Sequence, residues 1–154
     1  MKRIFLVGAP RSGTTILQSL LAAHPEIISF PESKFFHYLL SEQFSINLPS
    51  RLESFFRDEI KRPEFLQDFD VSQTTASKTG WFVGVLDSLA TEDKRSIWLE
   101  KTPEHIYFIE DIERLVPDAK FIHILRNGMD TIASMYEATR SFNDLWGGVW
   151  DLEH

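Results

Sequence analysis

The 154-residue sequence contains no cysteine. This excludes disulfide bonds, thiolate metal sites and a cysteine nucleophile, and nothing points to an oxidising compartment. Long apolar runs are also missing: the best, residues 16–23, is too short to cross a bilayer and contains Gln18 and Ser19. We therefore expect a cytoplasmic protein with no membrane partner.

Positive charge is scarce, because 16 Lys and Arg residues stand against 23 Asp and Glu residues and the net charge is -7. A chain of this sign repels polyanions, so nucleic acid is not expected as a partner. Any anion-binding site has to be built locally. With 43% hydrophobic and 25% charged residues, the chain fits a single domain with a sizeable core.

Short apolar runs alternate with amphipathic helical patterns at both ends of the sequence. Residues 4–7 and 27–30 are typical of buried strands and flank a helical pattern at residues 13–24. Residues 97–99 and 121–125 are strands of the same kind, and each precedes another helical pattern. The alternation predicts an α/β fold: a P-loop-like three-layer domain with a central parallel sheet and helices on both faces.

Three local expectations follow from the C-terminal half. Thr102 and Pro103 predict a helix start, with Thr as the N-cap and Pro at the first helical position. Residues 127–140 are expected to form a helix that turns its apolar side chains inward: Met129, Ile132, Ala133 and Tyr136. His123, within a predicted buried strand, is expected to be a hydrogen-bonded core histidine.

The middle of the chain, about residues 31–93, carries no readable motif. Helical stretches are expected near residues 48–60 and 80–89. Its many phenylalanines are more typical of packed helices than of a ligand slot. Nothing here identifies a ligand or an oligomeric state.

Residues 8–15 are the sharpest local feature, because a turn that contains glycine lies between a buried strand and a helix. Such a turn directs backbone N–H groups and the positive end of the helix dipole at one anion. Three hydroxyl side chains add donors: Ser12, Thr14 and Thr15. Gly8 and Gly13 have the P-loop spacing, but Thr14 stands where nucleoside triphosphatases carry lysine, and the cation is Arg11.

The residues alone leave several interpretations of this turn open. It is either an anion site or merely the end of a strand, with Arg11 a solvated charge. A kinase-like phosphotransferase using ATP and Mg²⁺ would need a carboxylate after a buried strand, and Glu100 is placed for that. A non-catalytic nucleotide-binding fragment, either truncated or degenerate, is a third possibility.

Two segments, in this order, resemble the signatures of the sulfotransferases that use 3′-phosphoadenosine 5′-phosphosulfate (PAPS). The first is Arg11-Ser12-Gly13-Thr14-Thr15, and the second is residues 121–135, FIHILRNGMDTIASM. The resemblance implies transfer of a sulfuryl group from PAPS to a hydroxyl or amine acceptor. It also implies that the first segment binds the phosphosulfate, while Arg126 and Ser134 hold the 3′-phosphate.

The arginine form of the loop, with Ala23-His24-Pro25-Glu26 after its helix, is similar to the branch that contains protein-tyrosine and bacterial sulfotransferases. This resemblance implies that Glu32 is the general base and matches Lys101 to a lysine before proline. For the chemistry, Arg11 suits the leaving phosphate and Lys101 the transferring oxygens. The cytosolic branch uses a histidine base, which keeps His105 as a rival to Glu32.

Four of these residues each follow a predicted parallel strand: Arg11, Glu32, Lys101 and Arg126. They should converge on the carboxyl edge of the sheet, where open α/β folds bind ligands. No metal is expected, because PAPS carries no triphosphate and no cluster with ligand spacing appears in the sequence.

The resemblance covers about residues 3–36 and 98–140. Members of the family are usually longer, with a C-terminal stretch that closes over the nucleotide, so we expect a short or truncated member. The end of the chain, Leu152-Glu153-His154, is either native sequence or the remnant of a histidine tag.

Overall fold

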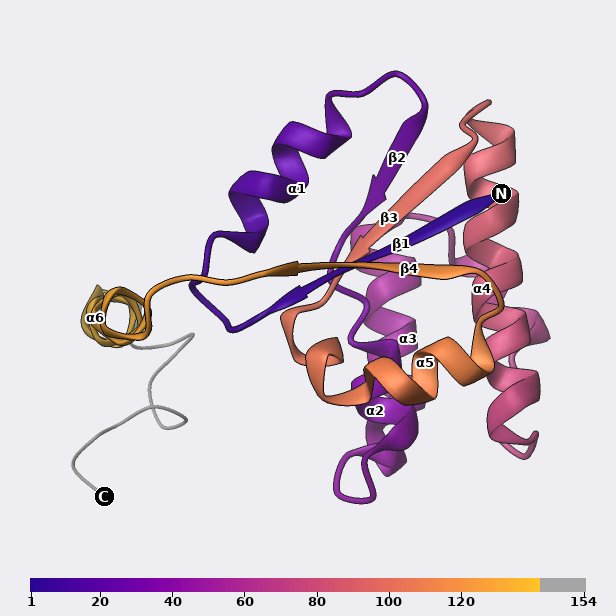
Figure 1. The fold of residues 1–154 in the computed structure, drawn as a ribbon. Coiled ribbons are helices and arrows are strands. Elements are labelled where there is room, and N and C mark those ends of the chain that lie inside the picture. Colours follow the sequence, from indigo (N-terminus) through magenta and orange to yellow (C-terminus); the bar gives the residue numbers. More distant parts are fainter. Residues whose placement is uncertain (142–154) are drawn as a thin grey trace.

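The computed structural model describes residues 1–141 and confirms the predicted parallel α/β sheet (Figure 1). Within these residues, four strands lie in the order β2-β3-β1-β4, and each neighbouring pair is parallel. They are β1 (Lys2–Gly8), β2 (Ile27–Phe30), β3 (Ile97–Lys101) and β4 (Ala119–Ile124).

The strand register aligns the carboxyl ends of the strands. Leu6 lies opposite Lys101 of β3, and Gly8, the last residue of β1, lies opposite Ile124 of β4. Phe30 at the end of β2 lies opposite Glu100. The segments that follow the four strands therefore leave the sheet at one common edge.

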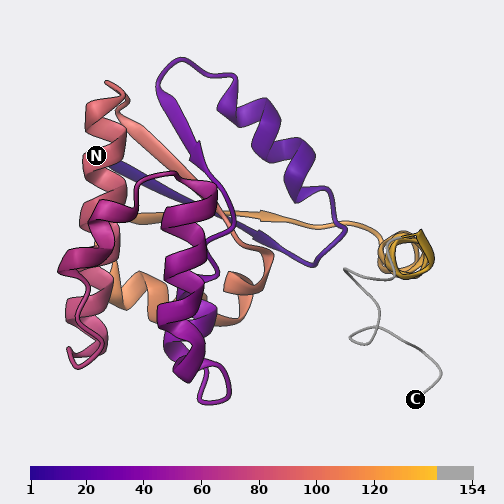
Figure 2. The same ribbon diagram turned by 180° about the vertical axis from the view of Figure 1, so that it is seen from behind.

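Helices cover both faces of the sheet, as predicted (Figures 1 and 2). On one face, α1 (Thr14–Ala22) packs Leu17 and Leu21 onto a small cluster that includes Leu6 and Leu99. The opposite face carries α2 (Phe35–Leu40), α3 (Leu48–Ser54), α4 (Thr75–Glu92) and α5 (Ile109–Leu115). Shorter helices are the 3₁₀ turns η1 (Ser45–Asn47), η3 (Pro63–Asp68) and η4 (Pro103–Phe108), and the π-helix η2 (Phe55–Glu59).

The main core is aromatic and lies between the sheet and the helices of the middle block, which is the part of the chain at about residues 31–93. The Phe35 and Phe82 rings stack at a centroid distance of 4.1 Å, and Phe5 of β1 packs edge-on against Trp98 at 5.2 Å. Five phenylalanines of the middle block are fully buried: Phe35, Phe36, Phe55, Phe56 and Phe82. This confirms that they pack helices together.

Helix boundaries in the middle block differ from the predicted ones. The helix expected near residues 48–60 is α3 followed by the π-helix η2. The helix expected at residues 80–89 begins at Thr75, because the Thr74 side chain caps it by accepting a hydrogen bond from the Ser77 N–H. A cap followed by polar residues carries no hydrophobic period, so the pattern alone missed the first turns.

Two expectations for the C-terminal part are wrong. β4 is an edge strand of the sheet, and His123 on it is exposed instead of lying in the core. On α6 (Gly128–Ser141), three side chains that were expected to point inward are 75%, 57% and 50% exposed: Met129, Ile132 and Tyr136. Ala133 is exposed as well.

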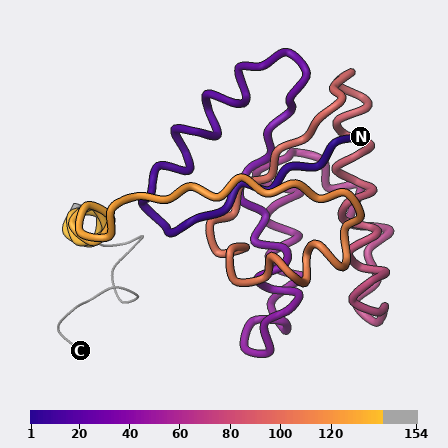
Figure 3. The backbone as a smooth tube through the Cα atoms, in the orientation of Figure 1, coloured from indigo at the N-terminus to yellow at the C-terminus, as the bar shows by residue number. Residues whose placement is uncertain are grey.

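The position of α6 explains this difference. α6 lies beyond the carboxyl end of β4 and not against a face of the sheet (Figure 3). Its buried residues are Thr131 and Ala138. An apolar stripe identifies a helix but not the surface that it packs on.

No helix in residues 1–141 is both long and apolar enough to span a membrane. The single-domain prediction for the whole chain stays a prediction, and the possible tag remnant, residues 152–154, lies outside the described residues.

The stacked core allows a first test of the fold. Phe82→Ala should lower the free energy of unfolding by about 3–5 kcal/mol, because it removes a fully buried ring and leaves a cavity. Urea unfolding followed by circular dichroism measures the change. Ile46→Ala is the control, since Ile46 is 84% exposed and its loss should cost less than about 0.5 kcal/mol. Equal effects of the two substitutions would contradict this packing.

Candidate active site

The turn after β1 has the backbone of an anion-binding loop. Arg11 and Gly13 both have left-handed φ angles, 67° and 104°, and the Ser12 N–H donates to the Ala9 carbonyl at 3.1 Å. Such changes of backbone hand turn neighbouring N–H groups toward one side. Gly13 is also the N-cap of α1 and provides no side-chain cap, which leaves first-turn N–H groups for another acceptor.

Two further features fit this turn to a ligand. A Cβ added to Gly8 would lie 2.7 Å from Ile124 Cγ2, so only glycine allows the end of β4 to approach the turn this closely. The Ser12 hydroxyl is buried and has no hydrogen-bond partner among residues 1–141. A buried hydroxyl of this kind calls for an acceptor, and a bound anion would provide one.

Three residues that the resemblance assigns to nucleotide binding lie together beside the turn: Arg11, Arg126 and Ser134. Arg126, just after β4, donates from Nη1 to the Arg11 carbonyl at 3.0 Å. Arg11 in turn donates from Nε to the Ser134 hydroxyl of α6 at 3.3 Å. Two guanidinium groups therefore gather beside the turn although the chain carries a net charge of -7.

Three further predicted residues lie together at the start of α1: Thr15, Glu32 and Lys101. Lys101, the last residue of β3, forms an ion pair with Glu32 through Nζ and Oε1, and its Nζ lies 3.5 Å from the Thr15 hydroxyl. The Lys101 side chain is only 7% exposed, whereas that of Glu32 is 35% exposed. The structure thus brings a carboxylate and an ammonium group together beside the turn.

Glu100, next to Lys101, is a fully buried carboxylate. Its Oε1 accepts hydrogen bonds from the Ser33 N–H at 3.0 Å and the Ser33 hydroxyl at 2.8 Å, and from the Thr102 hydroxyl at 2.5 Å. Its Oε2 lies 3.1 Å from His105 Nδ1. Burial acts to raise the pKa of Glu100, but His105, Thr102 and Ser33 together outweigh it and hold the pKa below its usual value.

This network changes the interpretation of three residues. Glu100 was the carboxylate placed near a metal in the kinase-like alternative, but its oxygens are buried among protein donors. His105, the rival base, is fully buried, and its Nε2 accepts from the Phe36 N–H at 3.2 Å. The Thr102 side chain does not cap the following helix, because it bonds Glu100 and the Lys34 N–H. Thr102 nevertheless occupies the N-cap position, with Pro103 at the start of the helix, as predicted.

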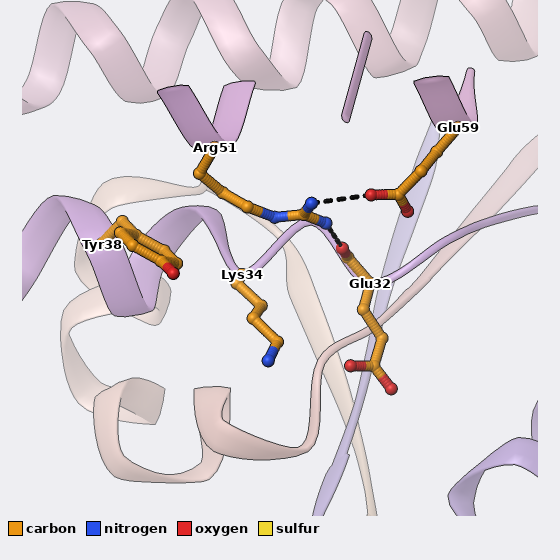
Figure 4. Close-up of a pocket in the computed structure, with 5 residues that line it drawn as sticks. All are labelled: Glu32, Lys34, Tyr38, Arg51 and Glu59. Atoms are coloured by element: carbon orange, nitrogen blue, oxygen red, sulfur yellow. Dashed lines mark hydrogen bonds and ion pairs between the residues drawn. The ribbon is translucent and has the colours of Figure 1, made fainter. Parts of the chain in front are cut away.

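Sequence reasoning missed the residues around Glu32 that come from the middle block. A cavity of about 450 Å³ is lined by Glu32, Lys34, Tyr38, Arg51 and Glu59 (Figure 4). Arg51 and Glu59 come from α3 and η2. No motif marks them, because residues about 20 to 30 positions apart meet here only through the tertiary fold.

The geometry defines an α/β domain of the P-loop-like class, with a glycine-containing turn between β1 and α1. A sequence model described as "Sulfotransferase family" matches residues 3–151. The chain therefore belongs to the sulfotransferase family, whose reaction is the transfer of sulfuryl groups, and the predicted family is confirmed.

Individual relatives agree with this assignment. Nodulation protein NoeE of Sinorhizobium fredii is 30% identical over 154 residues, which cover 93% of this chain and 31% of NoeE. Human protein-tyrosine sulfotransferase 1 is 26% identical over 136 residues, or 88% and 34% of the two chains. An uncharacterized protein of Aquifex aeolicus is 27% identical over 134 residues, or 87% and 17%. The chain spans about a third or less of the length of these relatives.

The Glu100 network predicts a pH-dependent stability. Glu100→Gln should lower the free energy of unfolding at neutral pH by about 2–4 kcal/mol, because buried donors lose a charged acceptor. The folded pKa of Glu100 lies below the ordinary 4.5, so its contribution is complete above that pH and is lost as the pH falls through the folded value. The difference in the free energy of unfolding between Glu100→Gln and wild type should therefore narrow as the pH falls.

Urea unfolding at a series of pH values measures this gap. Glu113→Gln is the matched control, because Glu113 is exposed on α5 and should leave stability almost unchanged at every pH. A gap for Glu100→Gln that stays constant with pH would contradict a carboxylate stabilised in its ionised form.

Proposed function

We propose that this chain binds PAPS at the turn after β1 and transfers its sulfuryl group to a hydroxyl or amine acceptor. The observation that carries the proposal is the grouping of side chains at the two ends of one anion-binding turn. Arg11, Arg126 and Ser134 lie at one end, and Thr15, Lys101 and Glu32 at the other.

On the donor side, the turn and the start of α1 hold the 5′-phosphosulfate. Backbone N–H groups and the hydroxyls of Ser12, Thr14 and Thr15 donate to it, and Arg11 stabilises the phosphate that leaves. Arg126 and Ser134 hold the 3′-phosphate. Support comes from the Arg126 guanidinium next to the Arg11 carbonyl and from the buried Ser12 hydroxyl that lacks a protein partner in residues 1–141.

On the acceptor side, Glu32 takes the proton of the acceptor while the acceptor atom forms a bond to sulfur. The bond between sulfur and the bridging oxygen breaks, and adenosine 3′,5′-bisphosphate leaves with the electron pair. Lys101 stabilises the charge on the transferring oxygens. The Glu32–Lys101 contact supports these roles, because base and cation must both reach the reacting group.

This mechanism needs no metal, because the donor has no triphosphate chain to neutralise. The cytoplasmic location and the truncated state predicted from the sequence remain predictions. The acceptor is a group that Glu32 can deprotonate.

Donor binding is tested by calorimetry with adenosine 3′,5′-bisphosphate and with ATP plus Mg²⁺. The bisphosphate should bind more tightly, and Arg126→Ala should weaken it by about 10- to 100-fold through the loss of a charged hydrogen bond. Lys120→Ala is the control and should bind like wild type, since Lys120 is exposed on β4 before the carboxyl end of the strand that Arg126 follows. Tighter binding of ATP with Mg²⁺ would favour the kinase-like alternative instead.

The role of Glu32 is tested by transfer of label from radiolabelled PAPS to phenol, sugar and amine acceptors. Glu32→Gln should reduce transfer by about 10²- to 10⁴-fold, because the acceptor loses its general base. The affinity for adenosine 3′,5′-bisphosphate should stay close to that of wild type. Undiminished transfer in the variant would remove Glu32 from the mechanism, and binding without any transfer in wild type would favour the non-catalytic alternative.

A further inference from the structure

The segment that carries Glu32 is fixed on its N–H side by the end of β3. The Ser33 N–H donates to Glu100 Oε1 at 3.0 Å, and the Lys34 N–H donates to the Thr102 hydroxyl at 3.1 Å. Lys34 has a left-handed φ of 53°, a conformation that costs a non-glycine residue free energy unless its surroundings hold it. Both bonds use N–H groups of the segment, and neither involves its carbonyl groups.

Arg51 occupies that carbonyl side. Its Nε donates to the Ser33 carbonyl at 3.0 Å, and its Nη2 donates to the Glu32 carbonyl. Its Nη1 pairs with Glu59 Oε1 at 2.7 Å, and the side chain is only 16% exposed (Figure 4). One planar guanidinium thus binds two consecutive carbonyls while its charge is balanced by a carboxylate.

We propose that Arg51 is a positioning residue for Glu32, a role that rests on the proposed function of Glu32 as the base. Arg51 holds the backbone on which Glu32 stands, and so keeps the Glu32 carboxylate beside Lys101. The middle block thereby contributes to the reaction through α3, although Arg51 bonds the Glu32 backbone and not its carboxylate.

The alternative role for Arg51 is direct contact with the acceptor, because Arg51 also lines the cavity beside Glu32. The two roles differ in what they predict. A contact with the acceptor changes KM, whereas a displaced base lowers kcat, and a displacement of about 1 Å costs on the order of 10²-fold in rate. Only the positioning role changes the surroundings of Lys101 in the absence of any acceptor.

The first experiment therefore needs no acceptor. The rate at which an amine-reactive reagent labels Lys101, read by mass spectrometry, should rise several-fold in Arg51→Ala, because the Glu32–Lys101 ion pair loosens. Arg51→Lys, which can still donate to one carbonyl, should restore part of the protection. Glu32→Gln serves as the positive control, since it removes the ion pair directly.

Arg57→Ala is the matched control, because Arg57 is also an arginine of this helical region but is 61% exposed and pairs only with neighbouring Glu53 among the described residues. It should leave the labelling of Lys101 at the wild-type rate. Labelling of exposed Lys120 should be the same in all variants. An unchanged rate for Lys101 in Arg51→Ala would overturn the proposal, and so would an equal rise for every lysine, which marks general loosening of the fold.

The second experiment uses radiolabelled PAPS with 4-nitrophenol as the probe acceptor. Arg51→Ala should lower kcat by about 10- to 100-fold with little change in KM or in the affinity for adenosine 3′,5′-bisphosphate. A raised KM at unchanged kcat would overturn the proposal in favour of acceptor contact. If wild type failed to bind the bisphosphate, the proposed function would fail, and the labelling of Lys101 would still decide whether Arg51 holds Glu32 in place.

Discussion

The buried carboxylate of Glu100 is the group on which the meeting of Glu32 and Lys101 depends. It joins the end of β3 to Ser33, three residues after the end of β2, and to Thr102 and His105 at the start of η4. Without a charged acceptor at this point, four donors would be buried with no common partner, which is costly in a low-dielectric interior. Glu32 and Lys101 are the sequence neighbours of Ser33 and Glu100, so their meeting follows from this contact.

The features that could be predicted from the sequence are those that depend on the local order of residues, namely the buried strands and the two signature segments. Short apolar runs at residues 4–7, 27–30, 97–99 and 121–125 predicted the four strands of the parallel sheet, because buried strands of α/β proteins are short and continuously apolar. The resemblance to a known family then identified the two signature segments. Since parallel strands end at one edge, the proximity of the candidate residues could be predicted before any contact was known.

The remainder could not be predicted, for physical reasons that differ between residues. Arg51 reaches the Glu32 carbonyl across 19 positions of sequence, and no periodicity encodes a contact between a side chain and a distant backbone. Glu100 and His105 are titratable residues of the kind that active sites use, yet here they stabilise the fold. The apolar stripe of α6 has the correct helical period, but period alone does not say which surface a helix meets.

The order of the strands also has a consequence for the size of ligand that the edge can accept. Across β2, β3, β1 and β4, the groups at or just beyond the strand ends are Glu32, Lys101, the turn and Arg126. Neighbouring strands are about 4.8 Å apart, a spacing fixed by backbone hydrogen bonds that no side chain can alter. The sheet therefore sets the distances between the backbone positions from which these side chains reach toward a bound molecule.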